Sequence, residues 1–254
     1  MILEAIQYAA SYPVTPTPFR PHIRSSVSLW SRARRCARDW AEHEENCRRF
    51  VQQTIAEMKQ RRTVVVLGSG LLRDVPVELL SRAFDTVVLV DLVHLASVRL
   101  WLKAKGLRNV RLISRDLSGF EDAVAGKTPE PLSFLRQVPY LDLVISTNLL
   151  TQIGVGIERR LEKEGNQSAA EVLPQVISAH LGGLAGLPCR TVLVTDTSYT
   201  VVDRGGNREE EGDLLHGVPA PMPQQDWLWP VVPFGEESRD YRIDHRVVAI
   251  RDLR

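Results

Sequence analysis

The sequence predicts an α/β fold: a doubly wound, mostly parallel sheet of seven strands with flanking helices, an antiparallel C-terminal hairpin and an N-terminal helical extension. Three observations lead to this prediction. Uninterrupted apolar strands alternate with helical segments, which is typical of a parallel sheet buried on both faces. A glycine turn joins the first strand to the helix that follows it. The last third of the chain turns polar and proline-rich and then ends on strand-like segments, as a hairpin does.

The N-terminal region, residues 1–61, differs from the rest, and we expect it to form an extended and helical cap on a main domain of residues 62–254. Residues 12–21 carry several prolines, so we expect them to lie extended across a surface. Residues 28–61 have apolar side chains at helical spacing and predict one long charged helix. Within it an arginine cluster is expected to pair with glutamates of the same helix; a patch for an anionic partner is the alternative. The cluster comprises Arg32, Arg34, Arg35 and Arg38.

The main domain starts with a strand at residues 63–67, followed by the turn Gly68-Ser69-Gly70. A helix at about 74–83 leads to a second strand, which ends on Asp91. The alternation continues through strands at 110–114, 141–147 and 190–195, with helices at about 95–105 and 168–184. Trp227 and Trp229 share one face of a strand, and residues 242–251 form the last strand of the hairpin.

The glycine turn indicates a nucleotide site, because glycines let the main chain approach a ligand closely. Asp91, about 20 residues further on, can accept hydrogen bonds from both hydroxyls of a ribose. The dinucleotide pattern needs a third glycine where this chain has Arg73, and bulky residues 71–73 leave little room for a pyrophosphate. A ligand with a ribose and no phosphate, such as S-adenosylmethionine, therefore fits better than NAD or FAD. A tight turn without any ligand is the alternative.

Composition restricts the other possibilities. Hydrophobic residues make up 44% of 254 residues and the net charge is +1, so a sizeable core is expected and no anionic partner is indicated. No apolar run is long enough to span a membrane, and the N-terminus has no signal-peptide pattern. The three cysteines include no C-x-x-C pair, and the histidines lack zinc-binding spacing. We therefore expect a cytoplasmic protein without a bound metal.

Four segments at the carboxyl ends of expected strands resemble the class I S-adenosylmethionine-dependent methyltransferases. The resemblance covers residues 62–196 well and the rest of the chain more loosely, and it implies a Rossmann-like S-adenosylmethionine-binding domain. The segments are Val65 to Gly70, Val88 to Asp91, Ser114 to Leu117 and Leu141 to Leu150.

The resemblance assigns roles to residues at these strand ends. Gly68 and Gly70 would lie beneath the methionine and ribose parts of the cofactor, and Asp91 would bind the ribose. Asp116, with the N–H of Leu117, would contact the adenine. Asn148 would face the methyl group or the acceptor. Each of the three polar side chains also has a structural alternative, because Asp91 can cap a helix, and Asp116 and Asn148 can form turns.

The remaining cofactor residues follow from the same comparison. Ser69 and Leu92 adjoin the glycine turn and Asp91 and are placed in the same site. The chain departs from the family at two positions, with Val66 where an acid is usual and Leu72 where a third glycine is usual. Asp74 is the candidate carboxylate for the amino group of the methionine part.

Methyl transfer requires alignment of acceptor, methyl carbon and sulfur, and a base only if the acceptor arrives protonated. The catalytic candidates are Asn148 and three side chains that follow the fifth strand: Tyr199, Asp203 and His216. We expect a small-molecule O or N acceptor and no nucleic acid or membrane partner. The oligomeric state is left open, with a homodimer as one alternative.

Two alternative functions remain. The departures at Val66 and Leu72 leave open an inactive, methyltransferase-like module that binds S-adenosylmethionine or S-adenosylhomocysteine. A nicotinamide-dependent oxidoreductase is disfavoured by Arg73 and because Tyr199 has no lysine four residues later.

Overall fold

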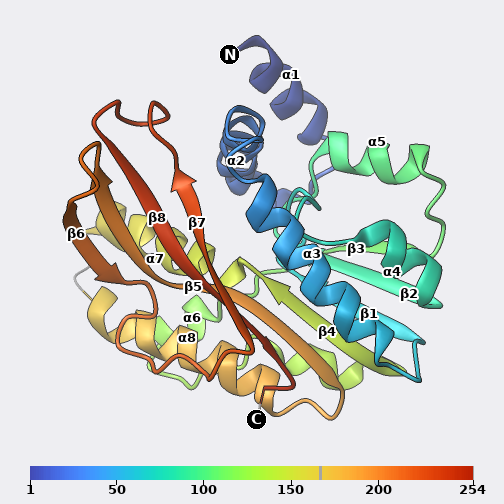
Figure 1. Cartoon of the computed structure of the whole chain (residues 1–254). Helices are drawn as coiled ribbons and strands as arrows, with labels where there is room; N and C mark the ends of the chain where they lie inside the picture. The colour runs from blue at the N-terminus through green and yellow to red at the C-terminus, as the bar shows by residue number, and fades with distance from the viewer. Residues whose placement is uncertain (166–167, 254) are drawn as a thin grey trace.

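An eight-stranded sheet forms the centre of the computed structural model, which describes residues 1–165 and 168–253. Helices cover both of its faces, with a long N-terminal helix lying across one of them (Figure 1). The strands are β1 (Thr63–Leu67), β2 (Thr86–Asp91), β3 (Val110–Ser114), β4 (Leu141–Thr147), β5 (Arg190–Asp203), β6 (Arg208–Asp213), β7 (Gln225–Val232) and β8 (Tyr241–Arg251).

Short and long helices alternate with these strands, as the apolar periodicity of the sequence predicts. Two 3₁₀ segments, η1 (Thr17–His22) and η2 (Ser133–Gln137), lie in connections. The α-helices are α1 (Ile2–Ser11), α2 (Ile23–Arg35), α3 (Ala41–Ala56), α4 (Val77–Ala83), α5 (Ala96–Ala104), α6 (Phe120–Val124), α7 (Leu149–Glu164) and α8 (Ala169–Ala185).

The strand order is β3-β2-β1-β4-β5-β8-β7, with β6 pairing with β5 outside this path. The first five strands are parallel, and β8 is antiparallel to both of its neighbours, β5 and β7. This arrangement confirms the predicted fold class. Strand β6 was not predicted, because its segment Arg208–Asp213 is charged and pairs only with the outer half of a β5 that continues to Asp203.

The N-terminal region differs from its prediction in two respects. Residues 28–61 form two helices, α2 and α3, because the chain turns at Cys36 and Trp40, whose side chains are buried beside Trp229. Residues 12–21 are not extended, because η1 begins within them. Pro18 lies in the first turn of η1, where backbone N–H groups form no bond within the helix, so the N–H that proline lacks is not needed.

The arginine cluster is held by a partner other than the expected one. Arg35 pairs with Glu236 at 2.5 Å and Arg32 with Glu237 at 3.3 Å, so the glutamates come from the loop after β7 and not from the same helix. Two of the four arginines, Arg32 and Arg35, are therefore paired with acids that lie about 200 residues later in the chain.

Helix α1 is anchored at its C-terminal end to α5. Ser11 is fully buried, and its Oγ accepts a hydrogen bond of 3.0 Å from the N–H of Ala96, the first residue of α5. Gln7 Nε2 donates to Ser97 Oγ at 2.6 Å. The N–H groups of a first helical turn have no partner within the helix, so Ser11 caps α5 from a distant part of the sequence.

Helix α3 shares one hydrophobic core with the sheet. Cys47, Phe50 and Val51 of α3 are fully buried and belong to the same cluster as Val64 and Val66 of β1. Burial of these apolar side chains stabilises the N-terminal region and the sheet together. The opposite face of the sheet is covered by α7 and α8 through a second cluster that includes Leu150, Ile177 and Leu184.

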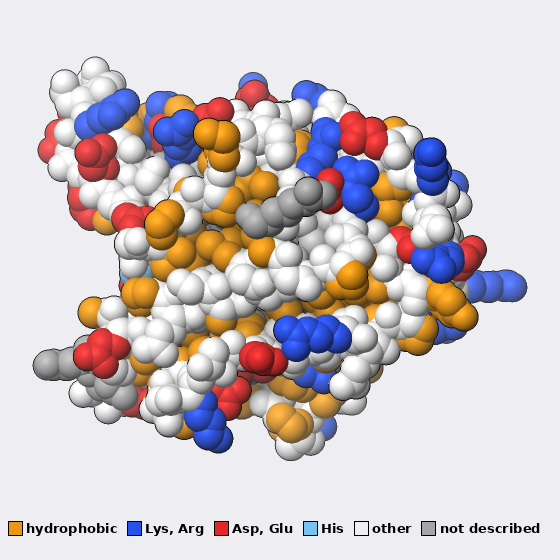
Figure 2. Space-filling view, turned by 90° about the horizontal axis from the view of Figure 1, so that it is seen from below, with side chains coloured by type: hydrophobic (Ala, Val, Ile, Leu, Met, Phe, Trp, Pro, Cys, Tyr) orange, Lys and Arg blue, Asp and Glu red, His pale blue; other side chains and the backbone are white. Residues whose placement is uncertain are grey.

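The surface has no single dominant character on the side that Figure 2 shows, where side chains of both charges are interspersed with hydrophobic ones. Among residues 1–165 and 168–253, no helix combines the length and the hydrophobicity that a membrane span requires.

Replacing Phe50 with Ala should lower the free energy of unfolding by about 3–5 kcal/mol, because a fully buried ring is lost and a cavity remains. Denaturant unfolding followed by circular dichroism measures this, with the exposed Gln52→Ala on the same helix as the control. Both variants should show one cooperative transition. A separate early transition that leaves the sheet intact would contradict the shared core.

Candidate functional site

The site lies where β1 is flanked by β2 on one side and β4 on the other. The strand order reverses beside β1, from β3-β2-β1 on one side to β4-β5 on the other, and open α/β sheets bind ligands at the carboxyl ends of the strands at such a point. Gly68 and Gly70 follow β1 with φ angles of 67° and 45°, a backbone region that suits glycine.

Asp91 holds the glycine turn in place. Its Oδ2 accepts a hydrogen bond of 2.7 Å from the N–H of Gly70, and its Oδ1 accepts one of 2.7 Å from the N–H of Leu92. A carboxylate has about four lone-pair sites, so both oxygens can accept further bonds from hydroxyl groups. The foreseen capping role is wrong, because the first N–H of α5 bonds to Ser11 and not to Asp91, and the ribose role stays a prediction.

Gly68 is required on steric grounds as well. A Cβ at this position would lie 2.9 Å from side-chain atoms of Leu149. Two polar atoms beside the turn are buried without a hydrogen-bond partner among the described residues: Ser69 Oγ and Asn148 Oδ1. Such atoms are uncommon in folded proteins, and they fit a site that is completed by a polar ligand.

Asp116 and Leu117 follow β3, next to β2 in the sheet. Asp116 is exposed and accepts a 2.8 Å bond from the N–H of Ser118, which is the geometry of a turn. Leu117 is buried. Both lie at the same edge of the sheet as Asp91, as an adenine-binding role requires, and that role stays a prediction.

Asn148 connects the glycine loop to the N-terminal helices. It adopts a left-handed conformation between β4 and α7, with φ at 52°. Its Nδ2 lies 2.7 Å from Asp74 Oδ2 and 3.0 Å from His43 Nε2. The other ring nitrogen of His43, Nδ1, accepts a 3.1 Å bond from the indole N–H of Trp227. A continuous polar chain thus runs from β7 through α3 to the loop after β1.

Aromatic rings enclose this chain. His43 stacks on Trp229, with ring centroids 3.9 Å apart and planes within 7° of parallel. Trp229 also meets Trp40 edge to face at 5.2 Å. Beyond Trp229, His245 Nδ1 lies 2.6 Å from Asp196 Oδ2, and Asp196 is 2% exposed. The arrangement places two histidines, His43 and His245, and the carboxylate of Asp196 on the α3 side of β5, β8 and β7.

Burial shifts the charge state of two of these groups. It lowers the pKa of His43 to about 4, so this imidazole is neutral at physiological pH. It raises the pKa of Asp74 to about 6, against the opposing effect of the Asn148 contact. The carboxylate of Glu44 on α3 raises the pKa of Asp74 further.

The structure does not bring together the three catalytic candidates in the sequence after the parallel part of β5. Tyr199 donates to Glu210 of β6 at 2.5 Å, and Asp203 accepts from Asn207 in the turn between β5 and β6. His216 lies 3.7 Å from Glu158 of α7. Of the predicted catalytic residues, Asn148 alone adjoins the glycine turn; roles for the other three stay predictions.

Sequence reasoning did not assign roles to His43, Trp227 and His245. His43 stands on the apolar face of α3 beside Cys47, where a histidine is usually a core residue. The spacing of Trp227 and Trp229 indicated one strand face but not its partner. The contacts join segments 184 residues apart, and no local pattern contains such information.

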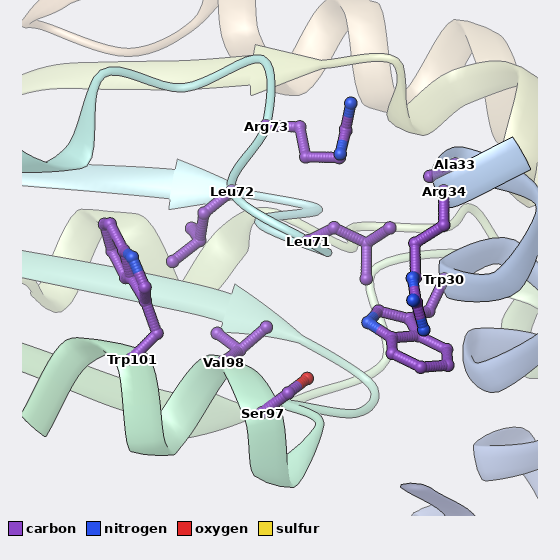
Figure 3. A pocket seen from close by; sticks show the side chains of 9 residues that line it. All are labelled: Trp30, Ala33, Arg34, Leu71, Leu72, Arg73, Ser97, Val98 and Trp101. Carbon is purple, nitrogen blue, oxygen red and sulfur yellow. The ribbon is translucent and has the colours of Figure 1, made fainter. Parts of the chain in front are cut away.

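A cavity of about 360 Å³ lies next to the glycine loop. Figure 3 shows Leu71 and Leu72 between Trp30 and Arg34 of α2 on one side and Val98 and Trp101 of α5 on the other. The residues predicted to bind the cofactor do not line it. Arg73, at the rim, forms an ion pair with Glu44 of α3.

No family model and no curated protein matches the chain. In structure it is similar to the S-adenosylmethionine-dependent methyltransferase SibL, at 14% identity and a TM-score of 0.33, over 65% of this chain and 38% of that one. It is also similar to the glycopeptide N-methyltransferase MtfA, at 13% identity and a TM-score of 0.37, over 80% of this chain and 76% of that one. For the 23S rRNA methyltransferase ErmE the identity is 15% and the TM-score 0.34, over 80% of this chain and 67% of that one. The chain thus spans well under half of the SibL structure.

The strand order, with the antiparallel β8 between β5 and β7, is that of a class I S-adenosylmethionine-dependent methyltransferase, the fold to which the sequence points. The MtfA structure contains S-adenosylmethionine, the cofactor that the sequence predicts for this chain.

One expectation is wrong. We expected a small-molecule partner and excluded nucleic acid. This exclusion is wrong, because the 23S rRNA methyltransferase ErmE is among the structures that this chain resembles. Near-neutral net charge was the reason for the exclusion, and net charge reports on the whole surface and not on one site.

Replacing Gly68 with Ala should destabilise the protein by more than the same change at Gly126. Both glycines have positive φ angles, but a Cβ at Gly126 would meet nothing within 4 Å. Gly126→Ala should cost about 1–2 kcal/mol from backbone strain alone, and Gly68→Ala a further 1–3 kcal/mol or so from overpacking. Urea unfolding measures both. Adding Leu149→Ala should recover part of the Gly68→Ala loss, and equal losses at the two glycines would refute the steric role.

Proposed function

We propose that this protein is an S-adenosylmethionine-dependent methyltransferase. The observation that carries the proposal is the bonding of the glycine turn after β1 to the carboxylate of Asp91 at the end of β2. It presents a main chain free of side chains and a ribose-binding acid at the crevice of an open α/β sheet. Residues 62–254 would hold the cofactor, and residues 1–61 would cover the site.

The residues present fit the chemical groups of this cofactor. Asp91 offers acceptors to the ribose hydroxyls, and Asp74 offers a carboxylate to the ammonium of the methionine part. Ser69 Oγ and one amide atom of Asn148 are buried beside the glycine turn without a partner among the described residues. A pyrophosphate fits less well, because Arg73, the nearest cation of the loop, is bonded to Glu44.

S-adenosylmethionine supplies a methyl group on a sulfonium that is already a good electrophile. The chain then needs to align an acceptor and exclude water. Asn148 and His43 are buried, and the partly buried Trp229 stacks on His43. These side chains lie at the end of β4, next to which the acceptor would lie. The atom that accepts the methyl group and the acceptor itself are left open by this proposal.

Replacing Asp91 with Ala should weaken binding of S-adenosylmethionine by roughly 10–100-fold, since a hydrogen bond to a charged group is worth about 1.5–3 kcal/mol. Isothermal calorimetry measures the affinity. Asp85→Ala is the matched control, because Asp85 is exposed just before the other end of β2. Unchanged affinity in Asp91→Ala would show that the ribose lies elsewhere.

Activity is tested with tritium-labelled S-adenosylmethionine and two acceptor pools, a small-molecule extract and total RNA. Transfer of label to either pool establishes a methyltransferase and indicates the acceptor class. Tight binding without transfer to either would favour the inactive binding module instead.

A further inference from the structure

The hydrogen-bond chain from Trp227 through His43 and Asn148 to Asp74 has a direction that is fixed at one end. An indole N–H can only donate, so Nδ1 of His43 must accept. A neutral imidazole carries one proton, which must then be on Nε2. The neutral state follows from the burial of His43, which is 2% exposed.

The proton on Nε2 needs an acceptor, and the atom at 3.0 Å is an amide atom of Asn148. The oxygen and nitrogen of an amide exchange places by a half-turn, so the hydrogen-bond network decides which of them faces His43. It must be the oxygen. The same amide atom lies 2.7 Å from Asp74 Oδ2. Two oxygens at this distance share a proton, so the satisfied chain contains Asp74 as a neutral carboxylic acid.

An ionised Asp74 reverses the chain. The carboxylate then accepts from the Asn148 amide N–H, which also donates to Nε2 of His43. The imidazole proton moves to Nδ1, where it faces the indole N–H of Trp227 at 3.1 Å. Two donors cannot form a hydrogen bond, so the contact between β7 and α3 at Trp227 is lost in this state.

The charged groups around Asp74 do not favour its ionised form over its protonated form. From α3 come Glu44 and Arg48, and from its own loop Arg73. Arg73 forms an ion pair with Glu44, and Arg48 pairs with Glu45 at 3.0 Å and donates to the main-chain oxygen of Arg73. Cys47 and His43 of α3 are uncharged neighbours. The ion pairs among the described residues do not include Asp74, and burial raises its pKa to about 6, so the neutral form predominates below that pH.

We propose that the ammonium group of the cofactor's amino-acid part binds Asp74 as a carboxylate, displaces its proton to solvent and reverses the chain, which releases Trp227 from His43. This inference rests on the proposed function. One proton leaves Asp74, and the proton of His43 moves from Nε2 to Nδ1. At pH values below the Asp74 pKa of about 6, the hydrogen bond between Trp227 of β7 and His43 of α3 is therefore lost only after the cofactor has bound, which loosens this one contact beside Asn148.

Calorimetric titration of the full-length protein with S-adenosylhomocysteine tests this, since that product carries the same ammonium group. The binding enthalpy is measured in two buffers of different ionisation enthalpy, which gives the number of protons released. With a pKa of about 6 for Asp74, roughly three-quarters of a proton should be released at pH 5.5 and about none at pH 8. The same titration with 5′-methylthioadenosine, which lacks the ammonium, should release none at either pH.

Two tryptophan variants distinguish an effect of the hydrogen-bond chain from an effect of side-chain packing. Trp227→Phe removes the group that only donates, so Asp74 ionises more readily and proton release at pH 5.5 should fall by about half or more, with binding retained. Trp229→Phe is the matched control, because its indole N–H has no partner among the described residues, and it should leave the release unchanged. Asp74→Asn should abolish the release and weaken binding.

The outcomes are distinguishable. Binding without proton release at pH 5.5, or equal release from the Trp227→Phe and Trp229→Phe proteins, overturns the inference and leaves the proposed function intact. Failure of the wild-type protein to bind S-adenosylhomocysteine overturns the proposed function itself.

Discussion

The position of β1 between β2 and β4 is the constraint on which the site depends. Parallel pairing on both sides brings the glycine turn, Asp91 and Asn148 to one edge of the sheet, although they lie up to 80 residues apart. Each then acts on the others: Asp91 fixes the turn through Gly70, and Leu149 leaves no space for a side chain at Gly68. A shift of register at either edge of β1 would separate all of these groups.

The site is built from two kinds of information, and only one is local. The strands at residues 63–67 and 141–147 were predicted with the observed bounds, because buried parallel strands are largely apolar runs. The edge strand at 110–114 was also predicted with its observed bounds, although its residues are only partly buried or exposed. The acid and the glycines fall at the ends of such runs. The placement of the acid and the glycines at one edge of the sheet could therefore be predicted from the sequence, and their roles stay predictions.

The contacts between the N-terminal helices and β7 could not be predicted from the sequence. His43 and Trp227 meet through tertiary packing, and α2 ends at Arg35 because Trp40 must reach Trp229 and the main chain of β7. Helical periodicity alone favoured an unbroken helix there. Strand β6 was missed for a related reason: its charged residues obtain their β-structure from pairing with β5 and not from their own preference.

The contacts that complete the N-terminal region also determine when it can form. Trp40 donates to Val231, Trp227 to His43, and Arg251 lies over the ring of Phe50, so helix α3 is held by residues near the C-terminus. On the ribosome, α3 is made first and its partners last. Strand β1 follows α3 directly, but the part of the α3 surface that contacts β7 and β8 stays uncovered until nearly the whole chain has been synthesised. Contacts of such long sequence separation slow folding, and a nascent chain in this condition is a substrate for chaperones.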